Sequence, residues 1–238
     1  MLKIEVVLSP ALLHLTDVKN ANVVVIDILR ATSTICTAIH HGAESVMALS
    51  TPLETLAWRE KGYLTAAERD GHKLEGFDMG NSPFECMDGK VKGKKIALTT
   101  TNGTKCIHAV SNNGAKAVFA GSFLNLNAMA KHLANDGGRI VLLCAGWKDS
   151  FNLEDTLFAG ALAQEVSLLT EVEIDCDAAL MSIDLYNLAK NDLKTYLKKS
   201  SHYKRLSHLS HEEDMVYCMQ TSIFETIVGV VDSEMKNI

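Results

Sequence analysis

The chain has only 3 prolines among its 238 residues, and it has no apolar run near the roughly 18 residues that a membrane-spanning helix needs. Its first ten residues are too short and too polar a stretch for a secretory signal. Hydrophobic residues make up 47% and charged residues 22%, which excludes a disordered chain, a fibrous repeat and a coiled coil. The composition predicts a globular protein with no membrane partner.

Basic residues and paired cysteines are also scarce. The chain has 23 lysines and arginines against 29 acidic residues, for a net charge of −6. Nucleic-acid binders usually carry a basic stripe, whereas the one dense lysine cluster, residues 194–204, lies in a polar helical stretch typical of a solvated face. The 6 cysteines include no CxxC pair, which argues against zinc. Scattered cysteines indicate reduced thiols, so we expect a cytoplasmic protein with no nucleic-acid partner.

Short β-branched runs alternate with helical segments through the first two thirds of the chain. The predicted strands are Ile4–Leu8, Val23–Asp27, Ser45–Leu49, Lys95–Thr100, Ala117–Ala120 and Ile140–Cys144. The predicted helices are Thr34–His41, Pro52–Lys61, Gly103–Ser111, Leu126–Asn135 and Leu153–Thr170. Several strands are continuous apolar runs, typical of strands buried on both faces of a sheet. This order predicts a three-layer α/β/α fold with a largely parallel or mixed sheet.

The last third of the chain is rich in helix formers. We expect several helices over roughly 177–225 and a short strand around 226–231. No proline- or glycine-rich linker separates this portion, so the sequence predicts one domain over 1–238 with the C-terminal helices packed on it. The apolar tail at 223–231 is a candidate surface for a homodimer.

Ligands of open α/β sheets bind beyond the carboxyl ends of the strands, so the residues that follow each strand are the first candidates. The strand near Val23 is followed by a carboxylate, an arginine and three hydroxyls at a helix start, namely Asp27, Arg30, Thr32, Ser33 and Thr34. Hydroxyls and free backbone amides at such a point suit a phosphate. The alternative is plain helix capping.

A second strand end carries a run of threonines. It has the sequence Thr100, Thr101, Asn102, Gly103 and Thr104. Gly103 would permit a positive φ and a close approach of the backbone to an anion. The alternative is an ordinary turn from strand to helix.

Two further segments supply carboxylates. Glu154 and Asp155 open the helix after the strand at 140–144, where they could simply complement the helix dipole. Residues 66–83 are predicted to form a long loop that carries Glu68, Arg69, Asn81 and Ser82 over the strand ends. Asp27, Glu68 and Asp155 are hard oxygen ligands of the kind that suits Mg²⁺ shared with a substrate phosphate.

Common catalytic motifs are missing. The sequence has no GxxxxGK followed by serine or threonine, no GxGxxG after a strand and no GxSxG elbow. Asp27 follows an apolar strand, as the nucleophile of an aspartyl-phosphate enzyme does, but Leu29 stands where a second acid would be expected. Direct hydrolysis and a phospho-enzyme route therefore both stay open.

Five ordered blocks resemble the 2-phosphosulfolactate phosphatase family, namely Val25–Thr34, Glu68–Arg69, Gly76–Pro83, Thr100–Thr104 and Leu153–Gly160. The resemblance implies a Mg²⁺-dependent α/β/α phosphatase that converts 2-phospho-3-sulfolactate to 3-sulfolactate, a step of coenzyme M biosynthesis. It implies that Asp27, Arg30, Ser33, Glu68, Asn81, Asn102 and Asp155 lie in the active site. Near the C-terminus the family pattern Ser…His-Gly-Arg-Leu…Asp…Cys corresponds to Ser201, His202, Arg205, Leu206, Asp214 and Cys218, with Tyr203-Lys204 in place of the glycine.

The sequence thus predicts a phosphoric monoester hydrolase acting on a small anionic phosphorylated substrate. Asp27, Arg30, Glu68 and Asp155 are the predicted catalytic residues, and the three carboxylates are the predicted Mg²⁺ ligands. The predicted substrate contacts are Thr32, Ser33, Thr34, Arg69, Asn81, Ser82, Thr100, Thr101, Asn102, Gly103, Thr104 and Arg205, with Lys148 as a further cation. Two alternatives stay open: a phosphatase of the same fold for another small phospho-acid, and a non-catalytic binder of a phosphorylated or sulfonated metabolite.

Overall fold

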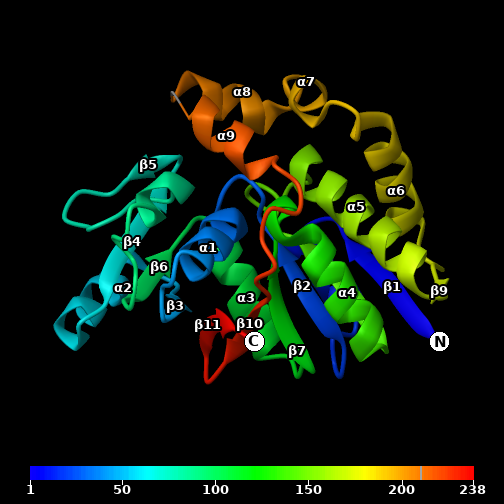
Figure 1. Cartoon of the computed structure of the whole chain (residues 1–238), viewed down its shortest axis with the longest axis horizontal. Coiled ribbons are helices and arrows are strands. Elements are labelled where there is room, and N and C mark those ends of the chain that lie inside the picture. The colour runs from blue at the N-terminus through cyan, green and yellow to red at the C-terminus, as the bar shows by residue number, and fades with distance from the viewer. Residues whose placement is uncertain (210) are drawn as a thin grey trace.

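The computed structural model describes residues 1–209 and 211–238. Within these residues the strands form one mixed sheet (Figure 1), in the order β5-β4-β6-β3-β11-β10-β7-β2-β8-β1-β9. The strands are β1 (Leu2–Val7), β2 (Asn22–Ile26), β3 (Ser45–Ala48), β4 (Leu64–Arg69), β5 (His72–Lys73), β6 (Lys95–Thr99), β7 (Ala117–Gly121), β8 (Arg139–Cys144), β9 (Val172–Glu173), β10 (Val228–Val231) and β11 (Glu234–Asn237).

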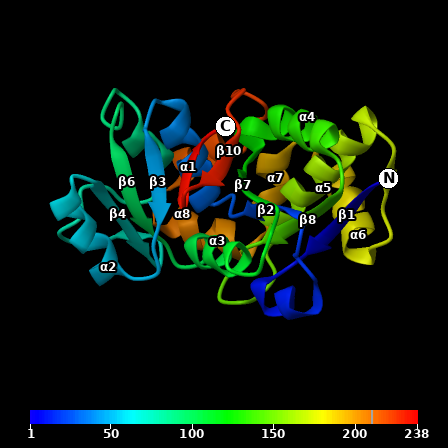
Figure 2. The same ribbon diagram turned by 90° about the horizontal axis from the view of Figure 1, so that it is seen from below.

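Helices cover both faces of the sheet, and Figure 2 shows α3 and α4 on opposite sides of it. The helices are α1 (Ala31–His40), α2 (Pro52–Ala57), α3 (Gly103–Ser111), α4 (Leu126–Asp136), α5 (Leu153–Leu169), α6 (Asp177–Ala189), α7 (Leu193–Leu197), α8 (Ser201–His208) and α9 (Glu212–Cys218). Short 3-10 turns lie at η1 (Pro10–Leu15), η2 (Trp58–Lys61), η3 (Pro83–Cys86) and η4 (Phe123–Asn125). The predicted three-layer α/β/α fold is confirmed.

Strand β2 explains why the predicted strands are continuous apolar runs. Val24 and Ile26 pack into the hydrophobic cluster that contains α4 and α5, and Val23 and Val25 pack into the cluster that contains α1 and α3. All four side chains are fully buried. Because successive side chains of a strand point to opposite faces, a sheet covered on both sides needs apolar residues at every position.

The sheet consists of two parallel halves joined by a hairpin. Strands β3, β4 and β6 are parallel to one another, as are β7, β2, β8, β1 and β9. The antiparallel pair β10 and β11 lies between them, with one register pair on each side, Gly229 with Phe119 and Met235 with Val46. Asp232 and Ser233 make its two-residue turn, both with positive φ. The predicted final strand is β10, whereas β11 was not predicted.

The predicted loop at 66–83 is wrong over its first part. Residues 64–69 form strand β4, which pairs in parallel with β6 and continues into a hairpin with β5. Asp70 and Gly71 make the hairpin turn with φ values of 52° and 89°. An Asp-Gly pair readily adopts the positive φ that such a two-residue turn needs at both positions, and this local signal could have revealed the hairpin. Glu68 and Arg69 therefore lie at the end of a strand.

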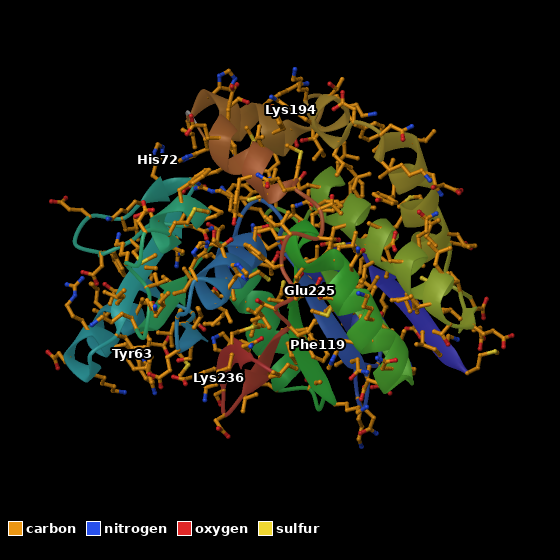
Figure 3. The ribbon with its side chains drawn as sticks, viewed as in Figure 1. Tyr63, His72, Phe119, Lys194, Glu225 and Lys236 are labelled. Atoms are coloured by element: carbon orange, nitrogen blue, oxygen red, sulfur yellow. The ribbon has the colours of Figure 1, made fainter. Side chains whose placement is uncertain are left out.

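The C-terminal helices cross the sheet at the carboxyl ends of its strands, where α8 and α9 form the upper part of Figure 1. The lysine cluster is exposed, as predicted, and Lys194 projects from the upper surface in Figure 3. The described helices include none long and apolar enough to cross a membrane. All six cysteines are free thiols, and all but Cys176 are buried.

Candidate active site

A polar pocket lies at the carboxyl ends of the strands, beneath α8. It is lined by Asp27, Leu29, Arg30, Glu68, Gly71, Asn81, Thr101, Asn102, Trp147, His202, Arg205 and Leu206. Seven of these are residues that the sequence predicts for the site: Asp27, Arg30, Glu68, Asn81, Thr101, Asn102 and Arg205. The folded chain thus brings together groups that are up to 178 positions apart in the sequence, from 27 to 205.

Asp27 directly follows β2 and is held by the start of α1. Its Oδ1 accepts the Ala31 N–H at 3.3 Å, while its own N–H donates to Thr32 Oγ1 at 3.0 Å. Burial raises the pKa of Asp27 from 3.8 to about 6, although the positive charge of His202 and the Ala31 hydrogen bond oppose this rise. Burial therefore disfavours the charged form of Asp27 until a cation binds beside it.

Gly103, the first residue of α3, allows this helix to come close to Asp27. A Cβ at Gly103 would lie 2.8 Å from Asp27 Oδ2 and 2.8 Å from the Ala31 Cβ. The predicted positive φ at Gly103 is wrong, because this glycine is not among those with positive φ. The close approach is instead between the N-terminus of α3 and the Asp27 carboxylate.

Glu68, near the end of β4, is the second carboxylate of the pocket. Its Oε1 accepts the N–H of Gly71 across the hairpin turn, and its side chain is buried. The charge of Glu68 raises the pKa of Asp27, so the two carboxylates interact across the pocket. The second oxygen of Glu68 accepts no hydrogen bond from the described residues.

Asp155, in the first turn of α5, occupies a different position from the one that its predicted metal role needs. Its Oδ1 accepts the Ile28 N–H at 2.9 Å and its Oδ2 accepts the Gly146 N–H at 3.0 Å. It does not line the pocket, and burial followed by the charge of Asp27 raises its pKa well above the usual value. Asp155 fastens the segment after β2 to the segment after β8.

Most of the predicted hydroxyls satisfy the protein's own backbone. Ser33 Oγ donates to the Ile28 carbonyl at 2.9 Å, and Thr34 Oγ1 donates to the Asn81 carbonyl at 3.1 Å. Thr100 and Thr104 exchange hydrogen bonds of 3.3 Å across the turn that starts α3. Thr32, Ser33, Thr34, Ser82, Thr100, Gly103 and Thr104 do not line the pocket. Helix capping by Thr32 or Ser33 is not observed, because the N-terminus of α1 has no side-chain cap hydrogen bond. Thr101 is the one predicted threonine that faces the pocket.

The two predicted arginines next to the carboxylates also have partners. Arg30 forms a buried ion pair with Asp214 of α9 and donates from Nη2 to the Gly71 carbonyl at 3.2 Å. Arg69 donates to the Glu68 carbonyl at 2.6 Å and to Thr99 Oγ1 at 3.0 Å, and it does not line the pocket. Ser82 Oγ donates to Asp214 Oδ1 at 2.6 Å. Arg30 therefore lines the pocket with its charge already balanced.

Helix α8 supplies the roof of the pocket, defined here as His202, Arg205 and Leu206. His202 Nδ1 bonds to Glu154 Oε1, and its ring packs against Trp147 with centroids 5.7 Å apart. The Arg205 guanidinium lies 3.6 Å above the Trp147 ring.

Trp147 and His202 were not predicted as site residues. The signals that could have found them are the i, i+3 spacing of His202 and Arg205 on one helix face and the hairpin that presents Trp147. In that hairpin the Trp147 N–H donates to the Ser150 carbonyl at 2.8 Å.

Several polar atoms at the pocket are buried and have no hydrogen-bond partner among the described residues. They are Asn81 Oδ1, Thr101 Oγ1 and Arg205 Nη2, together with Oε2 of Glu154 behind His202. A buried polar atom without a partner costs about 1–3 kcal/mol. Folded proteins keep few of them, so the three such atoms in the pocket lining mark a place for a polar ligand.

These donors fit a hard divalent cation held by two carboxylates. Asp27 and Glu68 face one pocket, with the unpaired Asn81 oxygen nearby in the same lining. Mg²⁺ is commonly held by one or two carboxylates, with waters and substrate oxygens as its other ligands. No group of three or more acidic, histidine or cysteine side chains gathers as a metal site in residues 1–209 and 211–238.

Comparisons with known proteins identify the family. Residues 7–233 match the 2-phosphosulpholactate phosphatase family. A protein of Caldanaerobacter subterraneus named "Probable 2-phosphosulfolactate phosphatase" is 39% identical over 215 residues, which is 89% of this chain and 88% of the relative. A protein of Thermotoga petrophila with the same name is 39% identical over 229 residues, which is 96% of each chain. The chain therefore belongs to the 2-phosphosulfolactate phosphatase family, a family of phosphoric monoester hydrolases.

Proposed function

We propose that the chain hydrolyses 2-phospho-3-sulfolactate to 3-sulfolactate and phosphate in a Mg²⁺-dependent reaction. The observation that carries this proposal is the convergence of Asp27 and Glu68 with unpaired Thr101 and Arg205 atoms at one pocket. The pocket offers acidic oxygens for a cation and polar hydrogens for an oxyanion, which is the pair of functions that phosphoryl transfer needs.

Asp27 and Glu68 are the residues that would hold Mg²⁺. When bound, the ion would polarise the phosphoryl group and orient water. The Thr101 hydroxyl would bind a phosphoryl oxygen next to the start of α3, because a helix N-terminus favours negative charge. Arg30, balanced by Asp214, would orient the substrate through its remaining guanidinium hydrogens.

The substrate's carboxylate and sulfonate need cations of their own. Arg205 has a buried Nη2 without a partner and lies flat on Trp147, so its guanidinium is held in one orientation. A guanidinium matches the paired oxygens of such groups. Lys148 is a second cation beside the pocket residue Trp147, with its Nζ 5.1 Å from the centroid of that ring and 3.4 Å from Asp70 Oδ1. We propose that these two side chains bind the two non-reacting anionic groups.

The Asp27→Asn variant tests the catalytic site. We expect kcat to fall at least about 100-fold, because loss of one strong electrostatic group at a transition state has this scale. Steady-state phosphate release is the measurement, and Asp17→Asn, a change at an exposed aspartate in the loop before β2, is the matched control. Activity of Asp27→Asn within about threefold of the unmodified protein would exclude this role for Asp27.

A panel of phosphomonoesters, assayed with Mg²⁺ and with EDTA, tests the substrate and the ion. We expect release from 2-phospho-3-sulfolactate that EDTA abolishes and added Mg²⁺ restores. Faster turnover of another small phospho-acid would favour the alternative substrate. Binding without release would favour the non-catalytic binder. The single domain, the homodimer, the cytoplasmic location and the place in coenzyme M biosynthesis stay predictions.

A further inference from the structure

His202 and Glu154 form a buried pair that the proposed reaction has not yet used. His202 lies in the first turn of α8 and Glu154 in the first turn of α5. The two side chains, joined through Nδ1 and Oε1, are 8% and 0% exposed. Glu154 also carries the unpaired buried atom Oε2. A charged acid so deeply enclosed is costly unless it balances a partner, and His202 is the partner that contacts it.

The pair fixes which ring nitrogen of His202 is available. Because Nδ1 bonds to Glu154, Nε2 is the nitrogen that remains for a ligand in the pocket. Trp147 packs against the His202 ring, and the Arg205 guanidinium lies over the same indole. A carboxylate that holds one nitrogen and leaves the other for chemistry is the arrangement of an oriented acid or base.

The position of His202 suggests which end of the substrate it serves. Asp27 and Glu68 come from the strand ends, whereas His202 comes from α8, which lies above those ends (Figure 1). His202 and Asp27 nevertheless line the same pocket. If a phosphoryl group binds beside the Asp27 and Glu68 carboxylates, its ester oxygen lies in the part of the pocket that α8 covers.

We propose that His202 is the general acid that protonates the leaving oxygen, and that Glu154 is the positioning residue that orients the His202 ring. This inference deepens the proposed function and rests on it. Alkoxides are poor leaving groups, so a positioned acid is worth roughly 100- to 10,000-fold in rate. The residue pair therefore suits esters of ordinary alcohols, which need that proton most.

The step balances without any further reactant. The oxygen of a water molecule forms a bond to phosphorus while the bond from phosphorus to the ester oxygen breaks. The electron pair of that bond passes to the ester oxygen, which takes the proton from His202 Nε2 and departs as the alcohol. The other product is dihydrogen phosphate, which returns one proton to the ring and leaves as hydrogen phosphate.

The test compares an alkyl and an aryl ester in the complete protein. In His202→Asn we expect kcat on 2-phospho-3-sulfolactate to fall roughly 100-fold or more, and kcat on p-nitrophenyl phosphate, whose phenolate leaves unaided, to fall less than about fivefold. Glu154→Gln should show the same selectivity with a smaller loss. His208→Asn, at an exposed histidine of the same helix, is the matched control and should change neither rate.

A second measurement needs only the native ester. The isotope effect of ¹⁸O in the bridging position should increase in His202→Asn, because the oxygen then leaves with more negative charge. Equal losses on both esters, or an unchanged isotope effect, would overturn the role of His202 while the phosphatase activity of the unmodified protein stands. If the unmodified protein releases phosphate from neither ester, the proposed function fails and this inference fails with it.

Discussion

At the scale of single residues, Asp27 is an acidic side chain in a buried position that disfavours its charged form. Asp27 is 9% exposed, and burial is the largest cause of its raised pKa. A cation at the pocket would reverse this penalty, because it stabilises the ionised form. Active-site residues often cost stability in this way, and their removal then stabilises the protein while it abolishes function.

The pH dependence of stability follows from this residue. Asp27 has a pKa of 3.8 when unfolded and about 6 when folded, so its favourable contribution exists below 3.8 and is lost as the pH rises through 6. The loss amounts to about 3 kcal/mol. The Asp27→Asn variant avoids this loss, so we expect its Tm to be higher by roughly 6–12 °C near pH 7.5 in EDTA.

The gain in Tm should shrink toward about pH 4, and calorimetry across this range is the measurement. Added Mg²⁺ should raise the Tm of the unmodified protein and leave that of Asp27→Asn almost unchanged, because the variant lacks one of the two carboxylates that would bind the ion. A gain that is the same at every pH would contradict the assignment to Asp27.

At the scale of elements, hydrophobic periodicity in the sequence predicts helices and strands correctly, whereas elements whose position depends on a turn were missed. The helix predicted at Gly103–Ser111 has those bounds in the structure. Strand β4 was missed because Leu64–Arg69 mixes apolar and charged residues, and its position depends on the Asp70-Gly71 turn and on pairing with β6. Trp147 was not predicted as a site residue for the same reason, because its orientation comes from a two-residue turn at Lys148 and Asp149.

The Gly71→Ala variant tests the turn between β4 and β5. The φ of Gly71 is 89°, and an added Cβ would lie 2.4 Å from Leu209 Cδ1. We expect Gly71→Ala to lose about 2 kcal/mol of unfolding free energy, from the left-handed backbone and the clash together. It should also lower kcat, because the Gly71 amide and carbonyl hold Glu68 and Arg30.

Urea denaturation measures the loss of stability. Gly62→Ala is the matched control, because Gly62 has a similar φ of 84° but no atom within 4 Å of the added Cβ. It should lose about 1 kcal/mol and keep full activity. Equal losses in the two variants would show that the contact with Leu209 carries no energy.

At the scale of the whole molecule, one ion pair fastens the C-terminal helices to the strand ends. Arg30 follows β2 and Asp214 lies in α9, and both side chains are almost fully buried. His211 Nδ1 lies 3.5 Å from Asp214, and Ser82 donates to it as well. The sequence could nominate Arg30 from its place after a strand, but not its partner, because nothing local relates residues 184 positions apart.

Asp214→Ala should therefore be strongly destabilising. An unpaired buried arginine costs about 3–5 kcal/mol, whereas replacing both partners by apolar residues is often close to neutral. We expect the Arg30→Met, Asp214→Leu double variant to recover a large part of the loss. A double-mutant cycle of urea denaturation is the measurement, and additive effects would contradict a coupled pair.

The hairpin of β10 and β11 joins the two halves of the sheet. The described halves pair with this hairpin and not directly with each other. Without residues 228–237 each half keeps its own strand pairs, but no hydrogen-bonded strand lies between β3 and β7. Removal of the hairpin therefore leaves two unpaired strand edges at the centre of the molecule, and such edges invite pairing with another chain.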